Sequence, residues 1–395
     1  MKFRSSLDKY RRAKPPLLGA QTHTVTVQSL TNEGDGVARV NGKATFVSHT
    51  APGDKVEIKI IENKSRYSRA DIVKLIEPSE HRVEPLCQWV EQCGGCAWQH
   101  LTYQHQLHTK QTQLLQTLKR VGNLSSVTIR NIVPSPNPYA YRNRVRGVAQ
   151  NGRFHFHKAR SDALVAIDSC AIAHSTINRY IAQPTEAFSK DRQIIELALT
   201  ENNSVSAMPV NSERSTELGF RQVNDAVSEL LTNAVLGIID EHFMPASDNP
   251  HPATTLLDLY CGHGSWTQRI ATRHPNISAV GIDVSEHNIR TARSQAMGIK
   301  NATFTVGRAE KALQQSHKKN DIVIVDPPRA GLSEELIQAL VAHTTSTLIY
   351  ISCHPATLAR DLAALSHGGY SIEFVQPFDM FPQTPHVESL AVLRS

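Results

Sequence analysis

The sequence contains no hydrophobic run that approaches the roughly 20 apolar residues needed to span a membrane. Its beginning lacks the apolar core of a secretion signal, and it contains no internal repeat or low-complexity tract. It has only six cysteines in 395 residues, and a chain of this size does not depend on disulfide staples. These absences predict a cytoplasmic protein with no membrane partner, in which cysteines serve as thiols, metal ligands or a catalytic group.

The composition is that of an ordinary soluble protein, with 40% hydrophobic and 20% charged residues. The length allows two or three domains with separate cores. The first 14 residues carry six basic side chains against Asp8 alone, a net charge of +5 within the +6 of the whole chain. Such a tail suits a polyanionic partner such as RNA, and a solvated arm explains it equally well. No obligate protein partner is evident.

We expect four regions along the chain: a basic tail (1–16), a small β-barrel (17–78), a central region (79–215) and a strand–helix domain (216–395). Short alternating strands between Thr22 and Leu75 predict a barrel of the OB type. The loop Lys64–Arg69 offers charge and one aromatic ring for single-stranded nucleic acid, although an ordinary basic hairpin loop is an equal alternative.

Two patterns stand out in the central region. Apolar residues recur at helical spacing and predict one buried helix face, formed by Leu107, Leu114, Leu118 and Val121. Arginines alternate in Tyr139–Arg146, which predicts Arg142, Arg144 and Arg146 on one face of a strand. Phosphate contact and a solvated sheet face are the competing interpretations.

The last region alternates strands with helices, which predicts a doubly wound, mostly parallel α/β sheet. No helix separates the final two strands, so we expect the last one to be antiparallel. The predicted strands are Leu256–Tyr260, Ala279–Asp283, Thr303–Val306, Ile322–Asp326, Leu348–Ser352, Ser371–Val375 and Ser389–Leu393.

A cofactor site is predicted where the first of these strands runs into the glycine turn Asp258–Gly264. Ligands of open α/β sheets bind at such turns, outside the carboxyl ends of the strands. Asp283 ends the next strand and can accept hydrogen bonds from ribose hydroxyls. The third glycine of a dinucleotide fingerprint is missing, which favours S-adenosylmethionine. Asp326, before two prolines, closes the reacting end of the pocket.

Cys353 follows an apolar strand and precedes a predicted helix near Pro355. Backbone N–H groups at a helix start favour a thiolate, the reactive form. A thiolate beside a methyl donor suits addition to pyrimidine C6, which makes C5 nucleophilic enough to take a methyl group. A base must then remove the C5 proton, and Glu388 is the carboxylate best placed by sequence.

Several motifs, in this order and spacing, make the chain resemble the RNA 5-methyluridine methyltransferase family. The resemblance is to the branch with an N-terminal TRAM barrel and an iron–sulfur cluster, and it covers nearly the whole chain beyond the tail. The motifs are Cys87-x5-Cys93-Gly-Gly-Cys96-x-x-Gln-His-Leu-x-Tyr103, Tyr141–Asn143, Gln222–Asn224, Asp258–Gly262, Asp326–Gly331, Ser352–Asp361 and His386–Glu388.

The resemblance implies a Rossmann-like class I methyltransferase domain with Cys353 as nucleophile and Glu388 as base. It further implies cofactor contacts at Gln222, Tyr260, Ser265, Asp283 and Asp326. Some positions depart from the family pattern, among them Arg221, His263, Trp266 and Arg308.

The resemblance also implies a 4Fe–4S cluster, with a structural or RNA-positioning use. Its ligands would be Cys87, Cys93, Cys96 and Cys170. By chemistry alone, four thiolates hold zinc equally well, although zinc sites more often pair two Cys-x2-Cys knuckles.

The sequence thus predicts an S-adenosylmethionine-dependent RNA uracil-C5 methyltransferase, and ribosomal RNA is favoured over the tRNA T-loop. One rival is an amino-group methyltransferase, which normally has an aromatic residue where Arg329 stands and needs no Cys353. The other is a non-catalytic RNA-binding or assembly factor, which would tolerate the loss of Cys353 and Glu388.

Overall fold

The computed structural model describes residues 22–183, 185–189, 192–210, 221–243, 254–315, 321–343 and 345–395. The predicted basic tail lies outside them. The chain divides into two compact units. The first comprises the described parts of Met1–Lys110, Asn137–Asn211 and Phe381–His386, and the second the described parts of Gln111–Pro136, Ser212–Met380 and Val387–Ser395. The boundaries of the four predicted regions stay a prediction.

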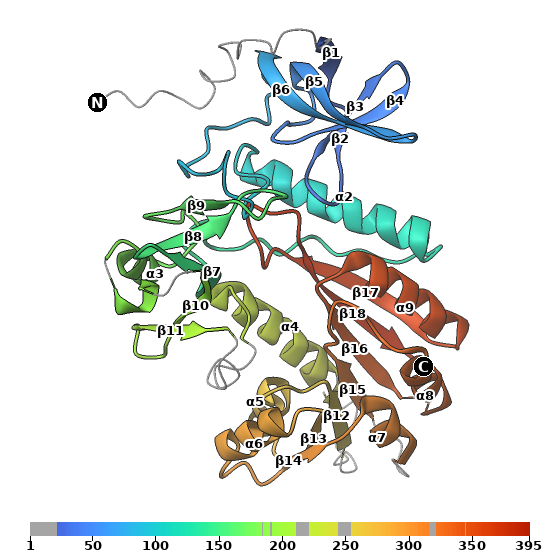
Figure 1. Ribbon diagram of the computed structural model, residues 1–395. Helices are drawn as coiled ribbons and strands as arrows, with labels where there is room; N and C mark the ends of the chain where they lie inside the picture. The colour runs from blue at the N-terminus through green and yellow to red at the C-terminus, as the bar shows by residue number, and fades with distance from the viewer. Residues whose placement is uncertain are drawn as a thin grey trace. The chain divides into compact units, whose positions relative to one another are not determined.

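The first unit begins with the predicted small barrel, a six-stranded sheet in the order β1-β5-β6-β4-β3-β2 (Figure 1). Its strands are β1 (Thr22–Thr26), β2 (Ser29–Leu30), β3 (Gly36–Val40), β4 (Lys43–Val47), β5 (Lys55–Asn63) and β6 (Tyr67–Glu77). Alternate side chains such as Val25, Val47 and Ile58 fill its core, as the period of a strand requires.

The predicted loop Lys64–Arg69 is shorter than expected, because β6 already begins at Tyr67. The Tyr67 ring packs against Phe46, with the ring centroids 5.4 Å apart. The Arg69 guanidinium pairs with the carboxylate of Asp35 at 3.0 Å. The aromatic ring and one of the charges therefore belong to the barrel's own packing.

A second, antiparallel sheet in this unit has the order β11-β10-β7-β8-β9. Its strands are β7 (Arg144–Gln150), β8 (Arg153–His157), β9 (Leu164–Ala166), β10 (Gln193–Leu199) and β11 (Val205–Pro209), accompanied by α3 (Ser175–Ile181) and the 3-10 helix η1 (Glu186–Phe188). Arg144 and Arg146 pair with Glu196 of β10 at 3.6 and 3.0 Å, whereas Arg142 lies before β7. This favours the sheet-face interpretation for these two arginines.

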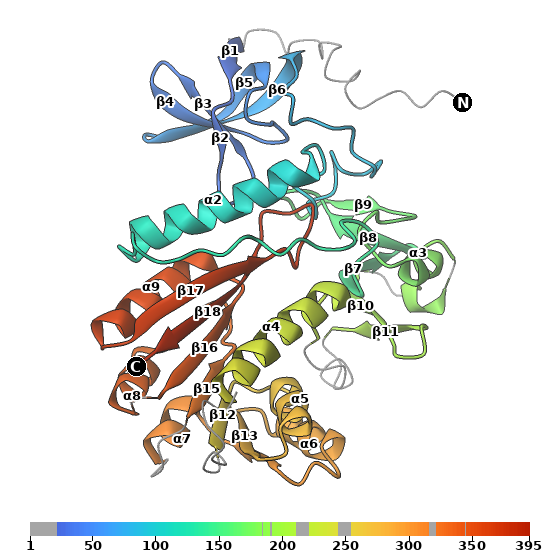
Figure 2. The ribbon, with the colours of Figure 1, turned by 180° about the vertical axis from the view of Figure 1, so that it is seen from behind.

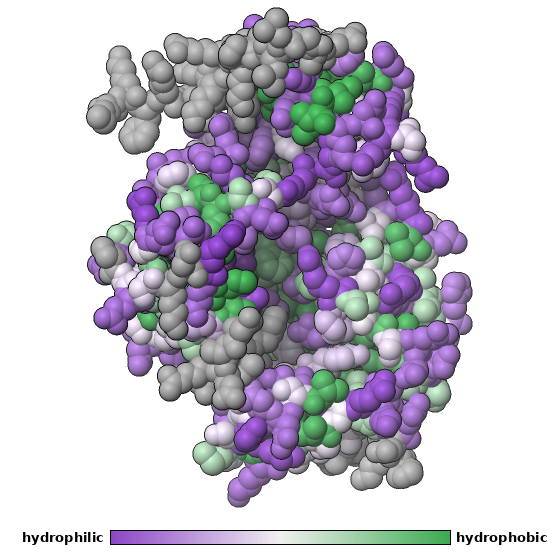
Figure 3. Space-filling view, viewed as in Figure 1, coloured by the Kyte–Doolittle hydropathy of each residue, from purple (hydrophilic) through white to green (hydrophobic). Residues whose placement is uncertain are grey.

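The predicted central helix is α2 (Tyr103–Val121). Leu107, Leu114 and Leu118 are buried as expected. Val121 is 54% exposed, so its assignment to the apolar face was wrong: it is the last residue of the helix, where the helix leaves the core. Among the described residues, no helix is long and apolar enough to cross a membrane, and the face drawn in Figure 3 is mainly hydrophilic.

The second unit contains the predicted doubly wound sheet, in the order β14-β13-β12-β15-β16-β18-β17 (Figures 1 and 2). All pairs from β14 to β16 are parallel, and β18 is antiparallel to both of its neighbours, as expected. The strands are β12 (Thr254–Leu259), β13 (Ile277–Asp283), β14 (Ala302–Val306), β15 (Ile322–Val325), β16 (Thr347–Ser352), β17 (Ser371–Phe378) and β18 (Glu388–Arg394).

Helices cover both faces of this sheet. They are α4 (Asp225–Phe243), α5 (Ser265–Arg273), α6 (Glu286–Gln295), α7 (Ala309–Gln315), α8 (Glu334–His343) and α9 (Pro355–His367). Leu257 and Leu259 of β12 join a core with residues of α7, α8 and α9. Asp258, between them, points to the other face and accepts a hydrogen bond from Thr267 of α5.

Candidate active site

The antiparallel pairing of β16 with β18 brings the predicted nucleophile and base together. Ser352, the last residue of β16, pairs with Ser389 of β18. Cys353 follows the last residue of β16, and Glu388 is the first residue of β18. The Glu388 carboxyl group acts electrostatically on the Cys353 thiol. The two predicted catalytic residues therefore lie near each other at the carboxyl edge of the parallel strands.

The chain turns sharply after Cys353 because α9 begins at once. His354 is the N-cap residue of α9, and its imidazole accepts a hydrogen bond from the Thr357 N–H at 3.3 Å. Pro355 follows at the start of the helix, where its fixed φ angle is favourable. The Ser352 hydroxyl accepts the His354 N–H at 3.2 Å. These contacts fix the half-buried Cys353 between a strand end and a helix start.

The electrostatic surroundings of Cys353 oppose the expected thiolate. Burial raises the pKa of its thiol, and the neighbouring Glu388 and Asp326 carboxyl groups raise it further. The positive charge of Arg329 acts in the opposite direction. A backbone hydrogen bond lowers the pKa of the Cys353 thiol, in the direction expected from the helix start, but burial next to carboxyl groups outweighs it.

Glu388 is only 2% exposed, and burial followed by the charge of Asp326 raises its pKa well above the usual range. Burial likewise raises the pKa of Asp326 to about 6, although a hydrogen bond from the Trp266 side chain opposes this. A carboxyl group with a raised pKa is a stronger base than an ordinary one. The site thus brings a thiol, a buried carboxyl group and a second carboxyl group together.

The glycine turn between β12 and α5 has the backbone that a closely approached ligand requires. Tyr260, Gly262 and Gly264 all have positive φ angles, of 65°, 55° and 77°. A Cβ at Gly264 would lie 2.3 Å from the Phe304 ring. Asp283, at the end of β13, accepts the Gly262 N–H at 3.0 Å. The turn and the predicted ribose-binding carboxylate therefore form one unit.

Gln222 and Ser265, two predicted cofactor contacts, both lie near the start of a helix. Gln222 lies three residues before the start of α4, and Ser265 is the exposed first residue of α5. Arg308 pairs with Glu310 and Glu335, so its guanidinium is already engaged.

Two exposed apolar residues at this edge were missed by sequence reasoning. Val284 follows Asp283 and is 66% exposed, and Val306 ends β14 and is 44% exposed. Large apolar side chains at the carboxyl ends of adjacent strands suit the flat face of a purine base. Their only signal in the sequence was their position at strand ends.

Asp361 was also missed, although it lies within a recognised motif. Its fully buried carboxylate accepts the Leu332 N–H at 2.8 Å, the Tyr350 hydroxyl at 2.7 Å and the Arg360 guanidinium at 2.7 Å. A Cβ at Gly331 would lie 2.4 Å from this carboxylate. Asp361 therefore holds the loop that follows Asp326 and carries Arg329.

Asp258 is fully buried, and burial raises its pKa to about 7. A carboxyl pKa raised in the folded state means that folding binds a proton, so stability is greatest below the unfolded pKa of about 4 and falls as the pH rises through 7. We expect the wild type to unfold at a lower urea concentration at about pH 8 than at about pH 5. Each unit by which the pKa is raised corresponds to about 1.4 kcal/mol in the free energy of unfolding.

Asp258→Asn should lose less stability over this range, because the amide keeps the shape without the buried charge. Glu241→Gln, an exposed substitution on α4, is the matched control and should follow the wild type. Parallel pH curves for Asp258→Asn and the wild type would contradict this assignment.

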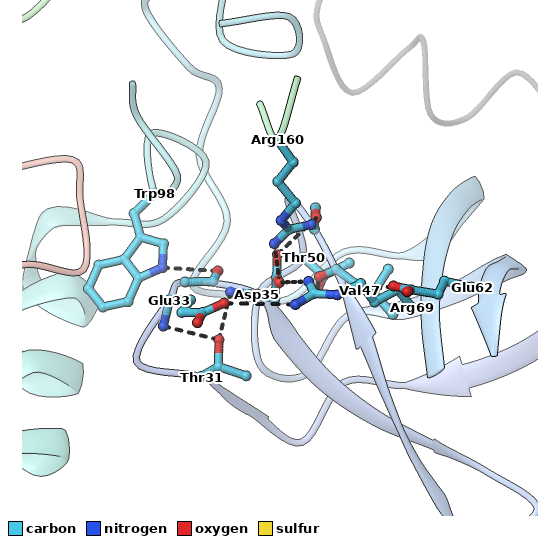
Figure 4. Close-up of polar contacts among 11 residues, drawn as sticks. Thr31, Glu33, Asp35, Val47, Thr50, Glu62, Arg69, Trp98 and Arg160 are labelled. Atoms are coloured by element: carbon cyan, nitrogen blue, oxygen red, sulfur yellow. Dashed lines mark hydrogen bonds and ion pairs between the residues drawn. The ribbon is translucent and has the colours of Figure 1, made fainter. Parts of the chain in front are cut away.

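The four cysteines of the predicted cluster are free thiols that line one cavity of about 490 Å³ within the first unit. Burial is the main cause that raises the pKa of Cys93 to about 11 and the pKa of Cys96 to about 12. Arg160 also lines the cavity and pairs with Asp35, which Arg69 contacts as well (Figure 4).

Within the described residues, no three histidine, cysteine or acidic side chains gather closely enough to hold a metal ion. The structure thus brings the four thiols to one cavity without forming a compact metal site there.

Two family models match different segments of the chain. A family model described as tRNA (Uracil-5-)-methyltransferase matches residues 197–395, and a TRAM domain model matches residues 19–73. An uncharacterized RNA methyltransferase of Bdellovibrio bacteriovorus is 34% identical over 99% of each chain. Another, from Halalkalibacterium halodurans, is 30% identical over 93% of this chain and 96% of its own.

A solved structure extends the likeness to the fold. The Pyrococcus abyssi tRNA (uracil-54, C5)-methyltransferase, in complex with S-adenosyl-L-homocysteine, is 25% identical with a TM-score of 0.70. The match covers 94% of this chain and 100% of that one. None of these descriptions names an iron–sulfur cluster. On the family match and the full-length relatives, the chain belongs to the RNA (uracil-5-)-methyltransferase family.

Proposed function

We propose that this enzyme methylates C5 of a uridine in RNA through a covalent bond between Cys353 and C6 of the base. The observation that supports the proposal is the β16–β18 pairing up to Ser352 and Ser389, next to which lie Cys353 and the buried Glu388, whose carboxyl group acts on the thiol. An amino-group methyltransferase needs neither group. A non-catalytic RNA-binding factor has no need of an acid buried at an energetic cost next to a thiol.

The donor we propose is S-adenosylmethionine, which supplies an electrophilic methyl group when bound. The S-adenosyl-L-homocysteine complex of the Pyrococcus abyssi enzyme supports this choice. In this chain, the Asp283 carboxylate would accept hydrogen bonds from ribose hydroxyls, and Val284 and Val306 would contact the adenine. Tyr260, Ser265, Gln222 and Asp326 are the further proposed contacts, with Asp326 nearest to the reacting groups.

In the proposed reaction, Cys353 is the nucleophile and Glu388 is the base. The Cys353 thiol gives its proton to solvent water and the sulfur bonds to C6, which moves electron density onto the O4 side of the ring and makes C5 nucleophilic. After C5 has gained the methyl group, the Glu388 carboxylate removes the C5 proton. The C6–S bond then breaks, restores the ring double bond and returns Cys353 as a thiolate. Arg329, whose charge lowers the pKa of Cys353, favours that leaving group.

The direct test is transfer of labelled methyl groups to RNA, followed by nucleoside analysis. We expect 5-methyluridine as the labelled product. Methyl groups on an exocyclic amine, or no RNA methylation at all, would contradict the proposal.

The target RNA is proposed as ribosomal RNA, in keeping with the prediction from barrel and cysteine motif. The second candidate is tRNA, which is named in the description of the matched family model and acted on by the similar Pyrococcus abyssi enzyme. Mapping 5-methyluridine in both RNA classes, with and without the gene, distinguishes them: the lost site identifies the substrate. Either RNA fits a cytoplasmic location.

We also propose that Cys87, Cys93, Cys96 and Cys170 hold a 4Fe–4S cluster, although neither the comparisons nor a compact metal group supports it. In favour, four free thiols line one cavity. Arg142, Arg146 and Lys158 also line it, and such cations stabilise a negatively charged thiolate cluster. Iron and acid-labile sulfide in equal amounts after anaerobic purification would support the cluster, whereas zinc or no metal would contradict it.

A further inference from the structure

The connection from β17 to β18 contains the segment Phe381–His386, which leads within two residues to Glu388. This segment belongs to the first unit, whereas Glu388 belongs to the second. We propose that Gln106 and Lys110 of α2 are positioning residues that set the place of the base by holding this segment. The inference rests on the proposed function, because it assigns to Glu388 the removal of the C5 proton.

Gln106 and Gln383 form a reciprocal pair. The Gln106 side-chain amide donates to Gln383 Oε1 at 2.9 Å, and the Gln383 backbone N–H donates to Gln106 Oε1 at 2.9 Å. Gln106 also donates to the carbonyl oxygens of Trp98 and Leu101, both at 3.1 Å. Gln106 is fully buried and Gln383 is 1% exposed. The side chain of Gln106 therefore supplies a hydrogen-bond acceptor for the buried backbone N–H of Gln383.

Lys110 provides a second hold one turn further along α2. Its ammonium group donates to the Phe381 carbonyl oxygen at 3.0 Å, and the residue is only 1% exposed. Its Nζ also lies 5.9 Å from the centre of the Trp98 ring. Burying an ammonium group costs free energy unless it is well bonded, so this contact gives the segment a specific anchor.

Further donors of the first unit complete the hold. The Tyr141 hydroxyl donates to the Pro382 carbonyl oxygen at 3.1 Å, and the Trp98 backbone N–H donates to the Gln383 carbonyl oxygen at 3.1 Å. Thus three successive carbonyl groups, at 381, 382 and 383, each accept a hydrogen bond. Gln383 has a φ of 69°, a left-handed conformation that surrounding contacts must maintain.

Because Glu388 follows His386 by only two residues, contacts that fix the segment Phe381–His386 also restrict the position of Glu388. Two residues span at most about 7 Å, so Glu388 cannot move far from a fixed His386. A general base must come within hydrogen-bonding reach of the proton that it removes. A displacement of 1 Å costs about 100-fold in rate. The motif Cys96–Tyr103 gains a role here, since Trp98 lies within it and Gln106 follows it.

The test uses the full-length Gln106→Glu variant, which keeps the shape but turns a donor toward three oxygen acceptors into a carboxylate. Two RNAs separate the steps. Uridine RNA requires the base for turnover. With 5-fluorouridine RNA the enzyme is trapped after attack and methyl transfer, because fluorine cannot leave C5 as a cation. We expect turnover on uridine RNA to fall roughly 10–100-fold, with trapping at the wild-type rate.

Lys110→Met is the second variant and should show the same split between turnover and trapping, with thermal unfolding as a check on folding. Gln104→Glu, exposed on the same helix, is the matched control and should behave like the wild type. Equal losses of turnover and trapping in folded variants would show a structural role and overturn the inference, as would unchanged turnover. Failure of the wild type to be trapped would instead refute the proposed function.

Discussion

Cys353→Ala is expected to abolish 5-methyluridine formation, reducing methyl transfer by several orders of magnitude, as the loss of a covalent nucleophile does in other enzymes. Without the sulfur, no bond forms to C6 and C5 stays too weak a nucleophile. The measurement is labelled methyl transfer to RNA under single-turnover conditions, which reports chemistry separately from product release.

The thiol is separate from the proposed ribose contact, so Cys353→Ala should bind S-adenosylmethionine with wild-type affinity in calorimetry. This control separates loss of chemistry from loss of the cofactor site. A Cys353→Ala enzyme that methylates RNA at the wild-type rate would remove the covalent step from the mechanism.

Glu388→Gln is expected to form the covalent enzyme–RNA species and then to resolve it slowly. The amide cannot take the C5 proton, and general base catalysis contributes about 10²–10⁴-fold. Denaturing gels of reactions with uridine RNA should show a slowly resolving adduct that the wild type clears. Rapid turnover in this variant would exclude Glu388 as the base.

The same substitution should stabilise the protein at neutral pH. The raised pKa of Glu388 means that its charged form is disfavoured by folding, so its cost appears as the pH rises above the unfolded pKa of about 4.3. We expect Glu388→Gln to unfold at a higher temperature than the wild type at about pH 8. The difference should be about 2–4 °C for each kcal/mol that the buried charge costs in the free energy of unfolding. The advantage should shrink toward pH 5. Glu241→Gln should show neither effect.

Much of the catalytic fold was predictable because its signals are local. Apolar strands alternating with helices indicated β12 to β18 to within three residues at each end, and the missing helix before Ser389 indicated the antiparallel strand. The glycine turn and Asp283 were visible because a ligand at the carboxyl edge needs both.

What remained hidden depends on contacts between distant residues. The pKa of Cys353 is raised by burial and by Glu388, which lies 35 positions away in the sequence and meets it only through strand pairing. The pair of Gln106 and Gln383 joins residues 277 positions apart and leaves no periodic signal. Asp361 looked like an ordinary helix residue until its partners Leu332 and Tyr350 were located.

The central claim is that the sulfur of Cys353 bonds to a pyrimidine carbon. It is tested most directly by trapping the wild-type enzyme on 5-fluorouridine RNA with S-adenosylmethionine, digesting the adduct and locating the nucleotide by mass spectrometry. We predict that the modified peptide contains Cys353 as the attachment point. An adduct on another residue, or active enzyme that methylates uridine RNA but forms no adduct, would contradict the account.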